Sequence, residues 1–184
     1  MLPKHKYLLT YRYTEIIHDL TVQFCEKFMP GFDQRRNREQ MIQAGRSGKQ
    51  NIVEGVGQSK TSKKGEIKLL GVANASLEEL ISDYEDFLRQ RGLKIWPKTD
   101  KRISEFRKIG FRLSSLSNLS SLGEFIEKPK LPLDPEKAAN FLLTLCHQAT
   151  FLLSRQIKRA ETDFINEGGY TEKLFKKRLS SRIK

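Results

Sequence analysis

The chain has 184 residues, enough for one domain and too few for two of ordinary size. It carries 34 Lys and Arg against 22 Asp and Glu, a formal net charge of +12, and 38% of its residues are hydrophobic. That apolar content is enough for a core, which excludes a disordered basic tail. No stretch approaches the roughly 20 apolar residues of a membrane helix, so we expect a water-soluble, cationic domain with no membrane partner.

Two helices are predicted in the first third of the chain. Apolar residues recur at helical spacing over 8–29, and Pro30 ends that pattern. Steps of three and four residues predict a second helix over 34–56. Its interior glycines, Gly45 and Gly48, each cost about 1 kcal/mol relative to alanine. We therefore expect them to allow close approach to the third helix, where the matching small residues are Gly71, Ala73, Ala75 and Ser76.

The third helix is expected to begin after a cap at Thr61 or Ser62 and to end before Gly92. The segment 100–122 contains a helical pattern followed by several serines. It predicts a short helix that gives way to a loop.

The last long helix is predicted over 135–165, with Asp134 as its cap and Pro135 at its first position. Gly168 and Gly169 break it, and 170–182 can form a short basic helix. The chain is thus expected to be all-α, an up-down-up-down four-helix bundle with a short extra helix before the last long one and a helical suffix. The predicted division is 1–165 for the bundle and 166–184 for the suffix.

Catalytic, cofactor and metal signatures are weak. The segment around Gly48 and Lys49 resembles a phosphate-binding loop, but Gln43 and Gln50 stand where the motif requires glycine and Ser or Thr. Two cysteines, Cys25 and Cys146, lie in helical patterns without a secretory segment, which favours a reducing cytoplasm. A zinc site needs four converging ligands, and only distant helices could bring these cysteines together with His18 and His147, so packing is the favoured interpretation.

A polar stripe on the second helix has two interpretations. Ser47, Asn51 and Glu54 follow one another at steps of four and three. We favour a structural role in helix-to-helix hydrogen bonds over acid–base catalysis, because no histidine or second carboxylate shares the stripe.

The positive charge is segregated along the chain. Segment 34–68 holds nine basic and three acidic residues, 69–88 holds five acidic residues and no basic one, and 89–112 holds nine basic and two acidic residues. Clustered cations attract phosphate backbones. The predicted nucleic-acid-binding residues are Arg35, Arg36, Arg38, Arg46, Lys49, Lys60, Lys63 and Lys64. The acidic stretch, with Glu78, Glu79, Asp83, Glu85 and Asp86, suggests head-to-tail contact between copies instead.

Several segments resemble a known family. The runs QMIQAGRSGKQNIVEG at 40–55, EIKL at 66–69 and ASLEEL at 75–80 resemble the bacterial four-helix-bundle proteins related to the 23S rRNA intervening-sequence protein. The ending GGYTEKL at 168–174, with Arg178 and Arg182, is similar to the C-terminal suffix of one branch. The resemblance implies a homopentameric ring and a connection with nucleic acid. A distant relative is the accessory protein of the reverse transcriptase in diversity-generating retroelements.

These observations lead to two hypotheses about function. The first is a non-enzymatic, oligomeric basic scaffold that binds RNA or DNA backbone with little sequence specificity. The alternative is a protein-interaction adaptor, such as an accessory subunit of a nucleic-acid enzyme. An enzyme that uses the Ser47, Asn51 and Glu54 stripe is the least favoured class.

Overall fold

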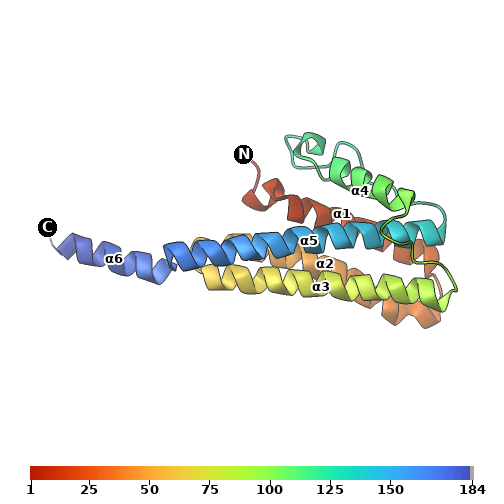
Figure 1. Ribbon diagram of the computed structural model, residues 1–184, viewed down its shortest axis with the longest axis horizontal. Coiled ribbons are helices and arrows are strands. Elements are labelled where there is room, and N and C mark those ends of the chain that lie inside the picture. Colours follow the sequence, from red (N-terminus) through yellow and green to blue (C-terminus); the bar gives the residue numbers. More distant parts are fainter. Residues whose placement is uncertain (183–184) are drawn as a thin grey trace.

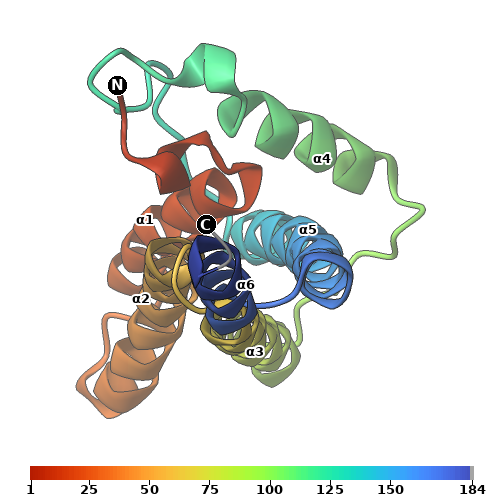
Figure 2. The same ribbon diagram turned by 90° about the vertical axis from the view of Figure 1, so that its left-hand side faces the viewer.

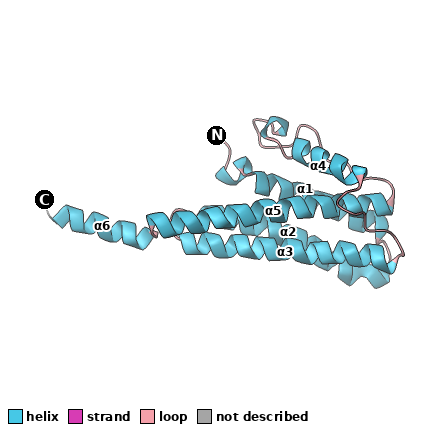
Figure 3. Cartoon of the chain, viewed as in Figure 1, coloured by secondary structure: helices cyan, strands magenta, loops and turns pink. Residues whose placement is uncertain are grey.

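A computed structural model describes residues 1–182 of the chain, and within that range the fold is all-α. Figure 3 shows helices joined by loops. The described residues contain one isolated backbone bridge, between Leu119 and Phe125. The helices are α1 (Leu9–Phe28), α2 (Arg35–Gln58), α3 (Lys63–Gln90), α4 (Lys101–Leu113), α5 (Pro135–Glu167) and α6 (Tyr170–Arg182). Short 3-10 turns cover Lys4–Tyr7, Phe32–Gln34 and Leu116–Asn118.

The four long helices, α1, α2, α3 and α5, lie alongside one another (Figure 1). Each of them packs against two others, α1 and α3 both being in contact with α2 and with α5. Figure 2 shows α4 outside this group, where it packs on α5. Five helices therefore pack together, and α6 continues past their end.

Helix boundaries follow local capping signals in the sequence. The predicted bounds of α1, α2 and α5 agree with the structure to within two residues. The side chain of Ser62 accepts a hydrogen bond from the backbone N–H of Gly65, and Asp134 accepts one from Lys137. Gly168 ends α5 with a φ of +71°, a left-handed conformation that glycine adopts without strain.

A single core fills the space between the long helices. Its largest fully buried side chains include Tyr13 on α1, Phe24 on α1 and Tyr84 on α3. The rings of Phe24 and Tyr84 meet edge to face at 5.1 Å, and the Tyr84 hydroxyl is hydrogen-bonded to Thr21 at 2.8 Å. The buried phenol is therefore satisfied, so its burial does not leave an unpaired polar group.

The small residues of α2 have two different neighbours, which corrects part of the prediction. A Cβ on Gly48 would lie 3.3 Å from Leu77 of α3, so close approach there is confirmed. A Cβ on Gly45 would instead lie 3.4 Å from the backbone of His18 on α1. Gly71 has open space around it, and Ala75 is exposed, so neither belongs to the contact. The helical repeat alone did not distinguish the two faces of α2.

The segment between α3 and α5 is fixed to the bundle by buried polar contacts. Arg12, only 3% exposed, donates to the backbone oxygens of Ser114 at 2.6 Å and Lys6 at 2.8 Å, and so holds the end of α4 against α1. At the other end of α4, the Trp96 indole donates to Glu136 at 2.7 Å and the Trp96 backbone N–H donates to Asn140 at 2.8 Å. The predicted short helix is thus anchored at both ends.

Candidate nucleic-acid interface

The eight cations predicted to bind nucleic acid do not form one surface. Three lie at the start of α2, two lie along it, and three lie at the turn into α3. Because α2 has 24 residues, its ends are about 36 Å apart. The structure therefore divides the predicted site into an initial group (Arg35, Arg36 and Arg38), a middle pair (Arg46 and Lys49) and a turn group (Lys60, Lys63 and Lys64).

Two of the three arginines in the initial group, Arg35 and Arg38, already have partners within the protein. Arg35 pairs with Glu39 at 2.8 Å on the exposed surface of α2. Arg38 donates to the backbone oxygens of Met29 and Gly31, which places its guanidinium over the end of α1. Cations at a helix C-terminus offset the negative end of its dipole. Arg38 therefore has a structural role that its charge alone did not predict.

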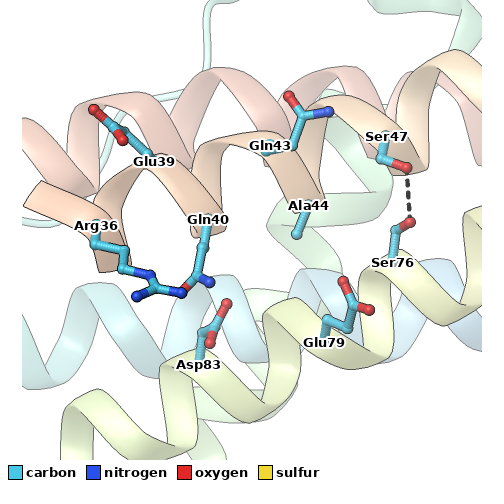
Figure 4. A pocket seen from close by; sticks show the side chains of 9 residues that line it. All are labelled: Arg36, Glu39, Gln40, Gln43, Ala44, Ser47, Ser76, Glu79 and Asp83. Atoms are coloured by element: carbon cyan, nitrogen blue, oxygen red, sulfur yellow. Dashed lines mark hydrogen bonds between the residues drawn. The ribbon is translucent and has the colours of Figure 1, made fainter.

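Arg36 borders an open groove between α2 and α3 that is lined with carboxylates (Figure 4). The groove has a volume of about 760 Å³ and includes Glu39 on α2 and Glu79 and Asp83 on α3. Burial raises the pKa of Asp83, and the nearby charges of Glu79 and Asp86 raise it further. This end of α2 therefore faces the acidic stretch of α3, which disfavours contact with phosphates.

The polar stripe of α2 lies at the same seam. The Ser47 and Ser76 hydroxyls are hydrogen-bonded at 2.9 Å, and Asn51 donates to the Ser47 backbone oxygen at 2.9 Å (Figure 4 shows the serine pair). Ser47 also lines the groove, whereas Glu54 is exposed and lies outside it. In the described chain, no hydrogen bond joins the Ser47 or Ser76 hydroxyl to an imidazole or a carboxylate.

Of the middle pair, one residue faces solvent and the other contacts α1. Arg46 is exposed on α2. The ammonium group of Lys49 lies 3.4 Å from Nδ1 of His18, which is itself 3.7 Å from Asp19. Only Arg46 of this pair extends freely into solvent.

The turn group is the part of the predicted site whose cations are most available. Lys60 and Lys64 are exposed and take part in no ion pair among residues 1–182. Lys63 pairs with Glu66 at 3.0 Å. Lys68, five residues after Lys63 on α3, is exposed. These lysines lie where α2 turns into α3, at the end of the bundle from which α6 projects (Figures 1 and 2).

Helix α6 adds further cations at that end. Lys173 donates to Glu167 at 2.9 Å, which lowers the pKa of Glu167 and joins α6 to the end of α5. Helices α3 and α5 pack together, and the start of α3 lies beside the end of α5 (Figure 1). We call this combined surface the basic end. It comprises the exposed or half-buried cations Lys60, Lys63, Lys64, Lys68, Lys173, Lys176, Lys177 and Arg178.

The side chains with potential metal or thiol chemistry lie elsewhere. Cys25 and Cys146 are both buried and free of disulfides. Burial raises the pKa of Cys25 to about 12 and raises that of Cys146 as well, so both remain protonated thiols. Over the part of the chain with assigned structure, no three His, Cys, Asp or Glu residues come together as a metal site. The segment that resembles a phosphate loop is continuous helix within α2.

A second cleft, which the sequence analysis did not predict, lies between α4 and α5. We call it the α4–α5 cleft; its volume is about 730 Å³. It is lined by Glu85, Ile95, Trp96, Pro97, Lys98, Ile103, Arg107, Asn140, Leu143, Thr144, His147, Gln148 and Phe151. Burial lowers the pKa of His147, and the charge of Lys98 lowers it further. The feature of the sequence that could have indicated this cleft is the basic segment 89–112. The position of that segment against α5 could not be predicted, because it depends on the tertiary fold.

Comparison of the chain with protein-family models, with curated proteins and with solved structures found no significant match. The resemblance to the intervening-sequence protein family therefore stays a prediction from the segments quoted above. None of the described helices has the length and apolar character needed to cross a bilayer.

Proposed function

We propose that the protein is a non-enzymatic scaffold that binds the backbone of RNA or DNA through its basic end, with little sequence preference. The observation that carries the proposal is the collection of cations at the α2–α3 turn and on α6, of which only Lys63 and Lys173 take part in ion pairs among residues 1–182. Phosphates bind such clusters by displacing counterions, and no base-reading geometry is required. The basic end thus replaces the eight scattered cations as the proposed interface.

Charge segregation also supports selective use of one end of the molecule. The initial part of α2 lies against Glu79 and Asp83, whereas the basic end contains fewer carboxylates than cations. A polyanion approaching the molecule is therefore attracted to the basic end and repelled by the α2–α3 groove.

The assembly and finer topology belong to the same proposal. The resemblance implies an up-down-up-down bundle and a homopentameric ring. In such a ring the acidic stretch of α3 would face cations of a neighbouring copy. A cytoplasmic location is likewise proposed, from the buried, unpaired cysteines.

The proposal is tested by equilibrium binding of a structured RNA and of a duplex DNA to the purified protein. Both should be retained at low salt and released as salt rises, because the affinity depends on displaced counterions. Two duplexes of unrelated sequence should bind within a few fold of one another. Absence of retention of either nucleic acid at low salt would refute the proposal.

A second candidate function, a protein-interaction adaptor, is supported by the surface of α6. Tyr170, Leu174, Phe175 and Leu179 are all more than 40% exposed on this 13-residue helix. Isolated helices of that length are marginal in water, so a contact that covers these side chains would stabilise α6.

The adaptor is distinguished from the scaffold by affinity capture from lysate with and without nuclease. A partner protein that persists after nuclease treatment, and that a Leu174→Glu, Phe175→Glu variant fails to capture, supports the adaptor. Loss of every partner on nuclease treatment supports the scaffold instead.

A further inference from the structure

The α4–α5 cleft combines an apolar floor with an aromatic rim. Ile103 on α4 is 7% exposed and Leu143 on α5 is 4% exposed, so their buried side chains form an apolar floor. Phe151, further along α5, is 62% exposed and contributes a largely uncovered ring. An exposed aromatic face next to an apolar floor is the kind of surface on which a planar ring stacks.

The charges around this cleft are mostly positive. Lys98 and Arg107 line it, and the Arg155 guanidinium lies 5.8 Å from the centroid of the Phe151 ring. Glu85 on α3 is the only carboxylate among its lining residues. A ligand that is both planar and anionic therefore satisfies both properties of the cleft.

We propose that the α4–α5 cleft binds the base and adjoining phosphate of a nucleotide. The base stacks on Phe151 over the apolar floor, and the phosphate is neutralised by Lys98 and Arg107. A cleft of about 730 Å³ is within the range that holds ligands of this size. The α4–α5 cleft is a separate surface from the basic end, and it binds a base in addition to a phosphate.

The cleft is expected to accept different bases. The Asn140 carboxamide is already occupied by Trp96 and by the backbone oxygens of Lys94 and Glu136. The Thr144 hydroxyl donates to the Asn140 backbone oxygen at 2.7 Å. Of the other lining side chains, the His147 imidazole and the Gln148 Oε1, which is buried without a hydrogen-bond partner among the described residues, remain to contact a base edge. Contacts to the base edge are confined to these two groups, so stacking and charge dominate the recognition.

The chain's single tryptophan allows a direct test, because Trp96 lines the cleft. The intact protein is titrated with adenosine 5′-monophosphate while Trp96 emission is followed, with ribose 5-phosphate as the ligand that lacks the base. The variants are Phe151→Leu, Arg107→Gln and Glu85→Gln, all at exposed positions where the fold is not at risk. Circular dichroism confirms that each is folded.

A saturable change in emission with the nucleotide, and a much weaker one with ribose 5-phosphate, is expected. Phe151→Leu should weaken binding roughly tenfold, since it removes the stacking face. Arg107→Gln should weaken binding and Glu85→Gln should strengthen it. The inference is overturned if emission does not saturate, if both ligands bind equally, or if the Phe151 variant binds as the wild type does.

The source of the nucleotide is identified by competition. If a single-stranded oligonucleotide displaces the monophosphate and its matched duplex does not, the occupant is an unpaired base of a strand. If neither displaces it, the occupant is a free nucleotide. Phe151 lies sixteen residues before Glu167, so it is about 24 Å along α5 from the basic end. Failure of the proposed function would therefore be seen separately, as a loss of duplex retention.

Discussion

At the residue scale, equal charges have different roles according to what surrounds them. Arg35 is paired on the surface, Arg38 bonds to the end of α1, and Lys60 is exposed without an ion pair among the described residues. The sequence predicts all three as members of one cationic block, because it gives their type and spacing only. Which of them is available to phosphate depends on neighbours that are distant in the chain.

Asp83 provides a prediction about stability. Its pKa is raised by burial and then by Glu79 and Asp86, so the fold favours the protonated carboxyl and the ionised form is a cost near pH 7. Asp83→Asn should raise the free energy of unfolding by about a few tenths of a kcal/mol, since solvent screens a half-exposed group. The gain should disappear towards about pH 4.

Urea denaturation at both pH values measures this effect. Glu85→Gln is the control, because Glu85 is exposed on the same helix and its charge is not among those that raise the pKa of Asp83, so it should give no gain. A gain for Asp83→Asn that is equal at both pH values would rule out the electrostatic explanation.

At the element scale, helix ends are more predictable than helix contacts. Ser62, Asp134 and Gly168 act within a few residues of themselves, and the boundaries they mark are found in the structure. Gly45 and Gly48 are three residues apart yet face α1 and α3, respectively. The partner of a helix face depends on the whole packing arrangement, which the repeat of a single helix does not contain.

Two glycine substitutions test these contacts. Gly71→Ala should stabilise the protein by up to about 1 kcal/mol, because alanine favours the helix and its methyl group meets nothing within 4 Å. Gly48→Val should destabilise it by about 1–3 kcal/mol, because its side chain would overlap Leu77. Chemical denaturation of both variants measures the difference. Stabilisation by Gly48→Val would contradict the close approach of α2 and α3.

The attachment of the α3–α4 segment to α5 gives a third prediction. Hydrogen bonds from the backbone of Lys94 and the indole of Trp96 lower the pKa of Glu136, so they favour its ionised form. Glu136→Ala should destabilise the protein by about 1–3 kcal/mol and move Trp96 emission to longer wavelength as the indole becomes more exposed. In the wild type this contribution is present above the ordinary pKa of glutamate and is lost as pH falls through the lowered value.

Glu136→Gln separates charge from hydrogen bonding in that attachment. The amide oxygen still accepts one bond, so an intermediate loss is expected. Unchanged emission and stability in both variants would contradict a role for Glu136 in holding Trp96.

At the scale of the whole molecule, the fold class and the order of the helices could be predicted, whereas the surfaces could not. Amphipathic periodicity reports burial along one helix, and it was sufficient for the all-α fold. The α4–α5 cleft, the α2–α3 groove and the basic end each combine residues from separate segments, such as Lys60 with Lys173. The net charge of each segment indicated whether a surface would be positive or negative, but not where on the molecule it would lie.

Assembly is tested by the mass of the protein in solution. The chain has a mass of 21.3 kDa, so the proposed pentamer should sediment or scatter light with about five times that value. If acidic α3 contributes to subunit contacts, the complex should dissociate as salt rises. A monomer at all salt concentrations would remove both the ring and the proposed contact between copies.

The central claim, that nucleic acid binds at the basic end, is tested most directly by the salt dependence of duplex DNA binding in two matched variants. One replaces Lys60 and Lys64 with glutamine, and the other replaces Arg35 and Arg36 with glutamine, so each removes two positive charges. The lysine variant should bind more weakly, and its slope of log affinity against log salt should be shallower by about 0.9 for each phosphate that it no longer neutralises. The arginine variant should bind as the wild type does. An unchanged slope in the lysine variant, or an equal weakening in both variants, would contradict the claim.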